Sequence, residues 1–207
     1  MKKLFVDLDG TLAKFNVRNA LKRFDNEIGF FAKLGAYVEI EKVNELAASG
    51  QVFVISASPN EQADKDKMIW LERFLPNVSK ENITICRIGE NKAKVIEDKY
   101  NIKIDNNCYL LDDYTKNLIE WKANNGIGIK RLTSVADNSR GIWQGLSIRR
   151  LGELAEILAW LRMRRCGTSP KFQRPTSATE HLFYSHLFKK TFKKLLTLKS
   201  NCSIIKL

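Results

Sequence analysis

Two aspartates near the start of the chain could carry out nucleophilic chemistry. Asp7 and Asp9 directly follow the apolar run Leu4–Val6, and Gly10 comes next. In an extended backbone, residues two apart point to the same side, so the two carboxylates face the same space. A carboxylate held beside a divalent cation can attack a phosphorus atom. The other carboxylate can then protonate the leaving oxygen and later activate a water molecule.

A second acidic pair and a serine follow other apolar runs. Asp112 and Asp113 come after Cys108–Leu111, and Ser56 comes after Val52–Ile55. In a parallel sheet the carboxyl ends of the strands meet at one edge, where such folds bind ligands. Four carboxylates crowded there repel one another unless a cation lies among them, and oxygen ligands suit Mg²⁺. The sequence therefore predicts a magnesium site. The alternatives are solvated turns for the acids and a helix N-cap for Ser56.

Phosphoryl transfer also needs a cation that neutralises the phosphate oxygens. Three lysines on one predicted helix could supply it: Lys92, Lys94 and Lys99. We favour Lys92, because a lysine at the start of a helix lies nearest the strand ends. The alternative is that all three lysines only solvate an exposed face.

The elements that must position these residues alternate between short apolar runs and helical patterns. Continuous apolar runs are typical of strands buried on both faces, and their alternation with helices indicates a parallel sheet. We expect an α/β fold, a three-layer Rossmann-like parallel sheet with a small helical cap inserted after the first strand. The expected strands are 4–6, 52–55, 83–86, 108–111 and 126–129, and the expected helices are 40–47, 60–74, 92–100, 114–124 and 148–165.

The positive charge of the chain is unevenly distributed. The 207 residues carry a formal net charge of +12. The last 46 residues, from Arg162 onward, contain eleven Lys and Arg and a single acid, Glu180, and so carry +10. We therefore expect a nearly neutral domain over 1–165 and a basic tail over 166–207, either an amphipathic helix or disordered. The tail could bind nucleic acid or anionic lipid, fold back on the domain, or have no selected role.

Four motifs resemble those of the haloacid dehalogenase superfamily, in the order that is expected for it. They are Asp7-Leu8-Asp9-Gly10-Thr11, Val54-Ile55-Ser56-Ala57-Ser58, Asn91-Lys92-Ala93 and Leu110-Leu111-Asp112-Asp113-Tyr114. The sequences of residues 111–118 and 124–130 are similar to those of the 5′(3′)-deoxyribonucleotidases of the cytosolic type C family. The resemblance covers about residues 1–161 and implies a phosphatase that uses Mg²⁺ and an aspartyl-phosphate intermediate.

The resemblance also implies a role for each candidate residue. Asp7 would be the nucleophile and a metal ligand, and Asp9 the general acid and base, with its backbone carbonyl on the metal. Asp113 would bind the metal directly, and Asp112 would either lie behind the metal ligands or hold a metal-bound water, but the order within this pair stays open. The residues implied in phosphate binding are Thr11, Ser56, Ala57 and Lys92.

Substrate choice would depend on the cap, which the sequence places within 15–48. Four aromatic residues are concentrated there: Phe24, Phe30, Phe31 and Tyr37. They could stack on a nucleobase, or they could form the small core of the cap itself. Both interpretations stay open.

The function expected from these observations is hydrolysis of a small phosphomonoester, with a nucleoside 5′-monophosphate as the favoured substrate. The alternatives are another small metabolite, a nucleic-acid phosphate end, or a non-catalytic protein whose tail docks on nucleic acid or membrane. The apolar run at 4–6 is too short for a secretion signal and the cysteines form no C-x-x-C pair, which favours a cytoplasmic location. A homodimer is expected only by analogy.

Overall fold

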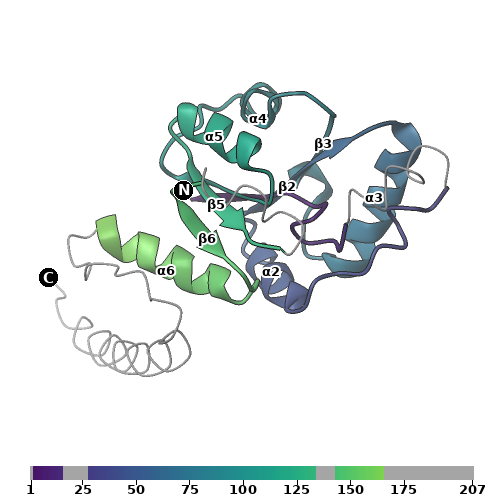
Figure 1. The fold of residues 1–207 in the computed structure, drawn as a ribbon, viewed down its shortest axis with the longest axis horizontal. Helices are drawn as coiled ribbons and strands as arrows, with labels where there is room; N and C mark the ends of the chain where they lie inside the picture. The colour runs from purple at the N-terminus through teal and green to yellow at the C-terminus, as the bar shows by residue number, and fades with distance from the viewer. Residues whose placement is uncertain (1, 16–27, 134–142, 166–207) are drawn as a thin grey trace, which may run out of the picture. The chain divides into compact units, whose positions relative to one another are not determined.

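A computed structural model describes residues 2–15, 28–133 and 143–165. Its centre is a six-stranded sheet in which all neighbouring strands are parallel, in the order β3-β2-β1-β4-β5-β6 (Figure 1). The strands are β1 (Lys3–Val6), β2 (Val52–Ser58), β3 (Ile83–Arg87), β4 (Cys108–Asp112), β5 (Ile127–Arg131) and β6 (Leu146–Ile148). The strand order reverses at β1, and this is the point where doubly wound sheets bind their ligands.

Helices alternate with the strands along the chain, and some of them begin at a side-chain cap. They are α2 (Ile40–Ala47), α3 (Glu61–Phe74), α4 (Lys92–Tyr100), α5 (Thr115–Ala123) and α6 (Glu153–Arg165), with a short 3₁₀ turn at Lys80–Asn82. The side chain of Asn60 accepts a hydrogen bond from the Ala63 N–H, and Asn91 caps the start of α4 in the same way. Such caps satisfy N–H groups that have no partner within the helix.

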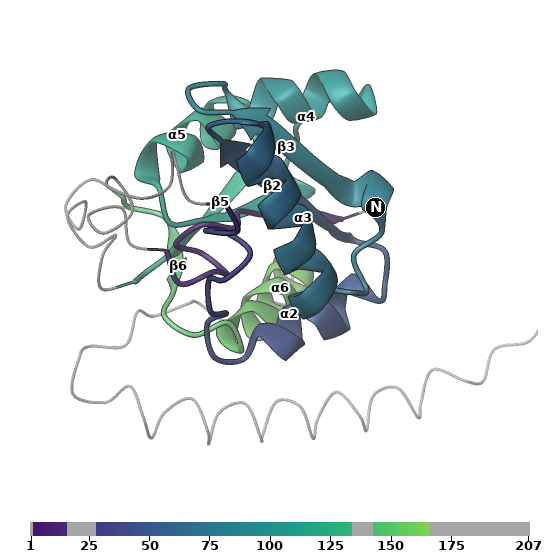
Figure 2. The ribbon, with the colours of Figure 1, turned by 90° about the vertical axis from the view of Figure 1, so that its right-hand side faces the viewer.

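The helices cover both faces of the sheet and bury two apolar cores. Side chains of α2, α3 and α6 pack with Val6, Val54 and Leu111 on one face. Side chains of α4 and α5 pack with Phe5 and Leu110 on the other. Figure 2 shows α4 and α5 on one side of the sheet and α2 and α6 on the opposite side. The predicted three-layer α/β class with a parallel sheet is confirmed.

Two expectations about elements are wrong. Ile148 does not begin a helix: it ends β6, pairs with Arg131 of β5 and is buried, while α6 begins at Glu153. Ile148 and Leu151 are three residues apart, a spacing that is also found on one face of a helix. β6 has three residues, too few to show an apolar pattern of its own. Ser56 is not a helix cap either, because it lies within β2 and Asn60 caps α3.

Several expectations fall on residues outside the described ranges, namely Phe24, part of the cap and the whole tail over 166–207. The chain divides into two compact units, 1–162 and 163–207, and the candidate site residues all lie in the first. Within the described part of the chain, no helix is both long and apolar enough to cross a membrane.

Candidate active site

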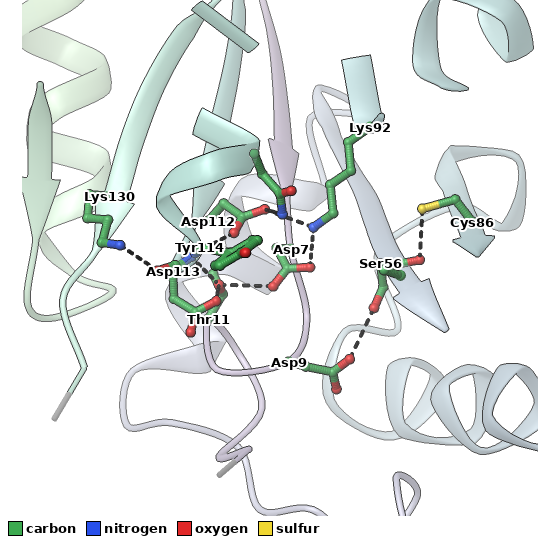
Figure 3. Close-up of polar contacts among 12 residues, drawn as sticks. Asp7, Asp9, Thr11, Ser56, Cys86, Lys92, Asp112, Asp113, Tyr114 and Lys130 are labelled. Atoms are coloured by element: carbon green, nitrogen blue, oxygen red, sulfur yellow. Dashed lines mark hydrogen bonds and ion pairs between the residues drawn. The ribbon is translucent and has the colours of Figure 1, made fainter. Parts of the chain in front are cut away.

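The site lies at the carboxyl ends of β1 and β4, which are neighbours in the sheet. Asp7 directly follows β1, and Asp112 is the last residue of β4. Lys92, the first residue of α4, lies between them: its Nζ is 2.5 Å from Asp7 Oδ1 and 2.8 Å from Asp112 Oδ2. Figure 3 shows this lysine bridging the two carboxylates. Lys94 is exposed, and Lys99 donates to the backbone carbonyl of Ile83 away from this site.

Three carboxylates form a cluster that could hold a metal ion. Asp7, Asp112 and Asp113 each offer one oxygen, and these atoms lie within 4.8 Å of one another. Asp112 has no exposed surface, and its remaining hydrogen bonds come from the Tyr114 N–H at 2.7 Å and the Asn117 amide at 2.9 Å. The carboxylate of Asp113 accepts a longer hydrogen bond, from the Thr11 hydroxyl to Oδ1 at 3.4 Å. This difference favours Asp113 as the ligand that could turn toward a cation.

Burial of these acids shifts their protonation. Desolvation, opposed by Lys92 and reinforced by Asp112 and Asp9, raises the pKa of Asp7 from 3.8 to about 7. Burial and the charge of Asp7 also raise the pKa of Asp113. Burial by itself would lower the pKa of Lys92, but attraction to Asp112 and Asp7 outweighs this effect and raises it. Acids that resist ionisation in such a cluster fit a site completed by a divalent cation, which favours their charged form.

The turn after β1 brings the two acidic segments together. Gly10 has φ +79°, and a Cβ atom there would lie 2.3 Å from Asp113 Oδ2, so only glycine leaves room for that carboxylate. The hydroxyl of the next residue, Thr11, lies 3.2 Å from Asp7 Oδ2 and accepts a hydrogen bond from the Asp113 N–H at 3.0 Å. The turn thereby fixes Asp113 relative to Asp7.

Asp9 stands apart from the acidic cluster. Its Oδ2 pairs with the ammonium group of Lys67 and lies 3.4 Å from the hydroxyl of Ser56. Figure 3 shows Asp9 turned toward Ser56 rather than toward Asp113. Ser56 is fully buried in β2, and Ala57 follows it in the same strand. The structure thus brings Asp9, Ser56 and Ala57 to one side of Asp7, and Thr11, Asp112 and Asp113 to the other.

Two further lysines of this region were not predicted from the sequence. Lys67 is buried in the middle of α3, on the same face as Ala63, Trp70 and Leu71, and a lysine at an apolar position was the available signal. Lys130 lies near the end of β5 and donates to the Asp113 carbonyl and the Thr115 hydroxyl, both at 2.6 Å. The strand-end rule that selected Asp112 could also have selected Lys130.

The cap aromatics separate into two groups. The rings of Phe15, Phe30 and Phe31 pack together, with centroids 5.0 to 6.3 Å apart. Phe31 is buried, whereas Phe15 and Phe30 are half-buried. Tyr37 instead lies under the guanidinium group of Arg131, 5.0 Å from the ring centroid. Burial favours a packing role for Phe31 and leaves parts of Phe15 and Phe30 accessible.

The chain is similar in fold to solved structures of enzymes that act on sugar phosphates. D,D-heptose 1,7-bisphosphate phosphatase from B. bronchiseptica, complexed with magnesium and phosphate, has a TM-score of 0.59 at 13% identity, covering 77% of this chain and 98% of its own. The β-phosphoglucomutase of Clostridium difficile has a TM-score of 0.52 at 12% identity, covering 80% of this chain and 99% of its own. No curated protein sequence matches the chain.

The sequence itself matches a family described as 5′ nucleotidase, deoxy (pyrimidine), cytosolic type C, over residues 7–138. This match covers more than half of the chain and includes all four motifs. The predicted relationship to haloacid dehalogenase hydrolases, and the predicted phosphatase class, are therefore confirmed. The chain belongs to the cytosolic type C 5′-nucleotidase family.

Proposed function

We propose that this chain is a nucleoside 5′-monophosphatase in which Asp7 is the nucleophile. The observation that carries the proposal is the bridge from Lys92 to Asp7 and Asp112 at 2.5 and 2.8 Å, beside the third carboxylate of Asp113. A buried carboxylate that contacts a lysine and belongs to a cluster able to bind a cation is suited to attack an anionic phosphate ester. The family match supports a nucleotide as the ester, with pyrimidine deoxynucleotides as the first candidates.

The reaction consists of two displacements at phosphorus. An oxygen of Asp7 bonds to phosphorus while the bond to the leaving oxygen breaks, and Asp9 gives that oxygen a proton. Water then attacks the aspartyl-phosphate and loses a proton to Asp9, and the bond between Asp7 and phosphorus breaks. Lys92 balances the charge of the phosphate oxygens throughout, since its ammonium group already contacts the nucleophile. The Ser56 hydroxyl, the Ala57 backbone and Thr11 would hold the phosphate.

The carboxylates fit a magnesium ion, which would be held by Asp7, Asp113 and the backbone carbonyl of Asp9. When bound, the ion neutralises the phosphate oxygens and keeps Asp7 ionised. Asp112 would act from outside this ligand set, because its oxygens are already engaged by Lys92, Asn117 and the Tyr114 N–H. The half-buried faces of Phe15 and Phe30 are suited to contact a base. The cytosolic description of the family supports a cytoplasmic location.

A phosphatase screen tests the proposal. Wild type, Asp7→Asn and the exposed control Asp98→Asn are assayed on nucleoside monophosphates and sugar phosphates, with Mg²⁺ and with EDTA. We expect wild type and Asp98→Asn to hydrolyse nucleoside monophosphates only with Mg²⁺, and Asp7→Asn to lose several orders of magnitude in rate. Full activity in Asp7→Asn contradicts the mechanism. A clear preference for sugar phosphates would contradict the proposed substrate class but would leave the proposed mechanism at Asp7 unchanged.

A further inference from the structure

Lys67 has an environment that is unusual for a lysine in a helix. Its side chain has no exposed surface and lies on the face of α3 that packs against the sheet. Its ammonium group contacts Asp9 Oδ2, the Ser56 hydroxyl at 2.9 Å and the Ala57 carbonyl at 2.5 Å. A lysine ammonium has three donors, so each donor has one of these partners.

These contacts come from the segments that carry the proposed chemistry. Asp9 lies in the turn after β1, whereas Ser56 and Ala57 lie in β2. The lysine also lies 4.7 Å from the ring centroid of Phe31, in the segment between these strands. One side chain of α3 therefore connects the general acid, the phosphate-binding strand and the start of the cap.

The two oxygens of Asp9 are in different situations. Oδ2 faces Lys67 and the Ser56 hydroxyl. Among the residues that the structure describes, Oδ1 is buried and has no hydrogen-bond partner. Oδ2 is thereby held in place, whereas Oδ1 has no hydrogen bond that would have to break before it could exchange a proton.

Burying a lysine is costly, because the ammonium group loses its hydration. A methionine or leucine at position 67 would complete the apolar face formed by Ala63, Trp70 and Leu71 at no such cost. By contrast, Lys65 on the same helix is exposed. The burial of Lys67 therefore indicates a task that an apolar side chain would not perform.

We propose that Lys67 is a positioning residue that clamps Oδ2 of Asp9 and so presents Oδ1 to the leaving oxygen of the substrate. This inference rests on the proposed function. It predicts that Lys67 matters when the leaving group needs a proton and matters little when it does not. Without a proton from Asp9, a nucleoside would have to leave as an unstable alkoxide, whereas p-nitrophenolate leaves as a stable anion.

The test compares kcat/KM for a nucleoside 5′-monophosphate and for p-nitrophenyl phosphate in wild type, Lys67→Met and the control Lys65→Met. We expect Lys67→Met to lose about 100-fold on the nucleotide, the lower end of what general acid–base catalysis contributes. Its activity on the aryl ester should change little, and Lys65→Met should resemble wild type on both. The ratio of the two values does not depend on the folded fraction, so partial misfolding leaves it intact. Lys67→Gln serves as a second variant if Lys67→Met does not fold.

A double variant shows whether Lys67 acts through Asp9. Adding Lys67→Met to Asp9→Asn should cost no further activity on the nucleotide, because residues that act as a unit are not additive. Equal losses on both esters, or losses that add fully in the double variant, would overturn the inference and leave the proposed function standing. A wild type that hydrolyses neither ester would overturn the proposed function itself, and this inference with it.

Discussion

Gly10 and Gly50 have similar backbone conformations but different surroundings. Their φ angles are +79° and +69°, yet a Cβ atom would meet Asp113 at Gly10 and nothing within 4 Å at Gly50. Alanine at either position should cost about 1 kcal/mol for the left-handed backbone. Gly10→Ala should also displace Asp113 and lower kcat/KM by about 100-fold, as misplaced catalytic groups do. Urea unfolding and phosphatase kinetics on both variants check this, and wild-type kinetics in Gly10→Ala would contradict it.

The raised pKa of Asp7 predicts a pH dependence for the metal-free protein. The native state keeps this proton up to about pH 7, whereas the unfolded chain releases it near 3.8. Between these values the native state binds more protons, so the contribution of Asp7 to stability falls as the pH rises. Mg²⁺ must displace the proton at low pH, so it should raise the Tm more at pH 7 than at pH 5.

Thermal unfolding of wild type and Asp7→Asn, each in EDTA and in Mg²⁺, isolates this contribution from that of other groups. In EDTA, the stability of wild type relative to Asp7→Asn should decline from pH 5 to pH 7. A relative stability that rises over this range would show that the carboxyl is already ionised without the metal.

At the scale of elements, two helix caps have the same structure but support different parts of the molecule. Asn60 caps α3 and Asn91 caps α4, each by accepting a backbone N–H three residues ahead. Alanine at either position should cost about 1 kcal/mol of stability. Asn91→Ala should also lower kcat/KM, because Lys92 is the first residue of α4 and contacts Asp7. If the two variants lose stability and activity in equal measure, Lys92 is held by its own contacts and not by the cap.

The strands that carry the acids were predictable because each is a continuous apolar run that ends in a carboxylate. The parallel sheet then places Asp7 next to Asp112 with no further assumption, since β1 and β4 pair directly. Lys67 was not predictable from this rule, because it lies in mid-helix and its importance depends on which strand α3 packs against. β6 was missed for another reason: with three residues at the sheet edge, pairing with β5 defines it more than its own sequence does.

At the scale of the whole chain, charge and chemistry are separated. The four carboxylates of the site belong to a nearly neutral domain, whereas the last 46 residues carry +10. The family match ends at residue 138, and the proposed catalytic residues all precede it. A chain that ends at Arg165 should therefore keep the kcat/KM of the full chain at 0.15 M salt, where charges are screened beyond about 8 Å.

Repeating the comparison at low ionic strength shows whether the tail attracts anionic substrates. At 0.01 M salt screening is weaker, and charges interact over distances of about 30 Å. A tail that attracts anionic substrates would then raise kcat/KM in the full chain but not in the shorter one. We expect this difference to be small, because chemistry at a buried carboxylate is slower than diffusion in most enzymes. At 0.15 M salt, electrostatic steering by the tail is screened. If kcat/KM of the shorter chain is then more than about tenfold lower, the basic tail contributes to catalysis or substrate binding.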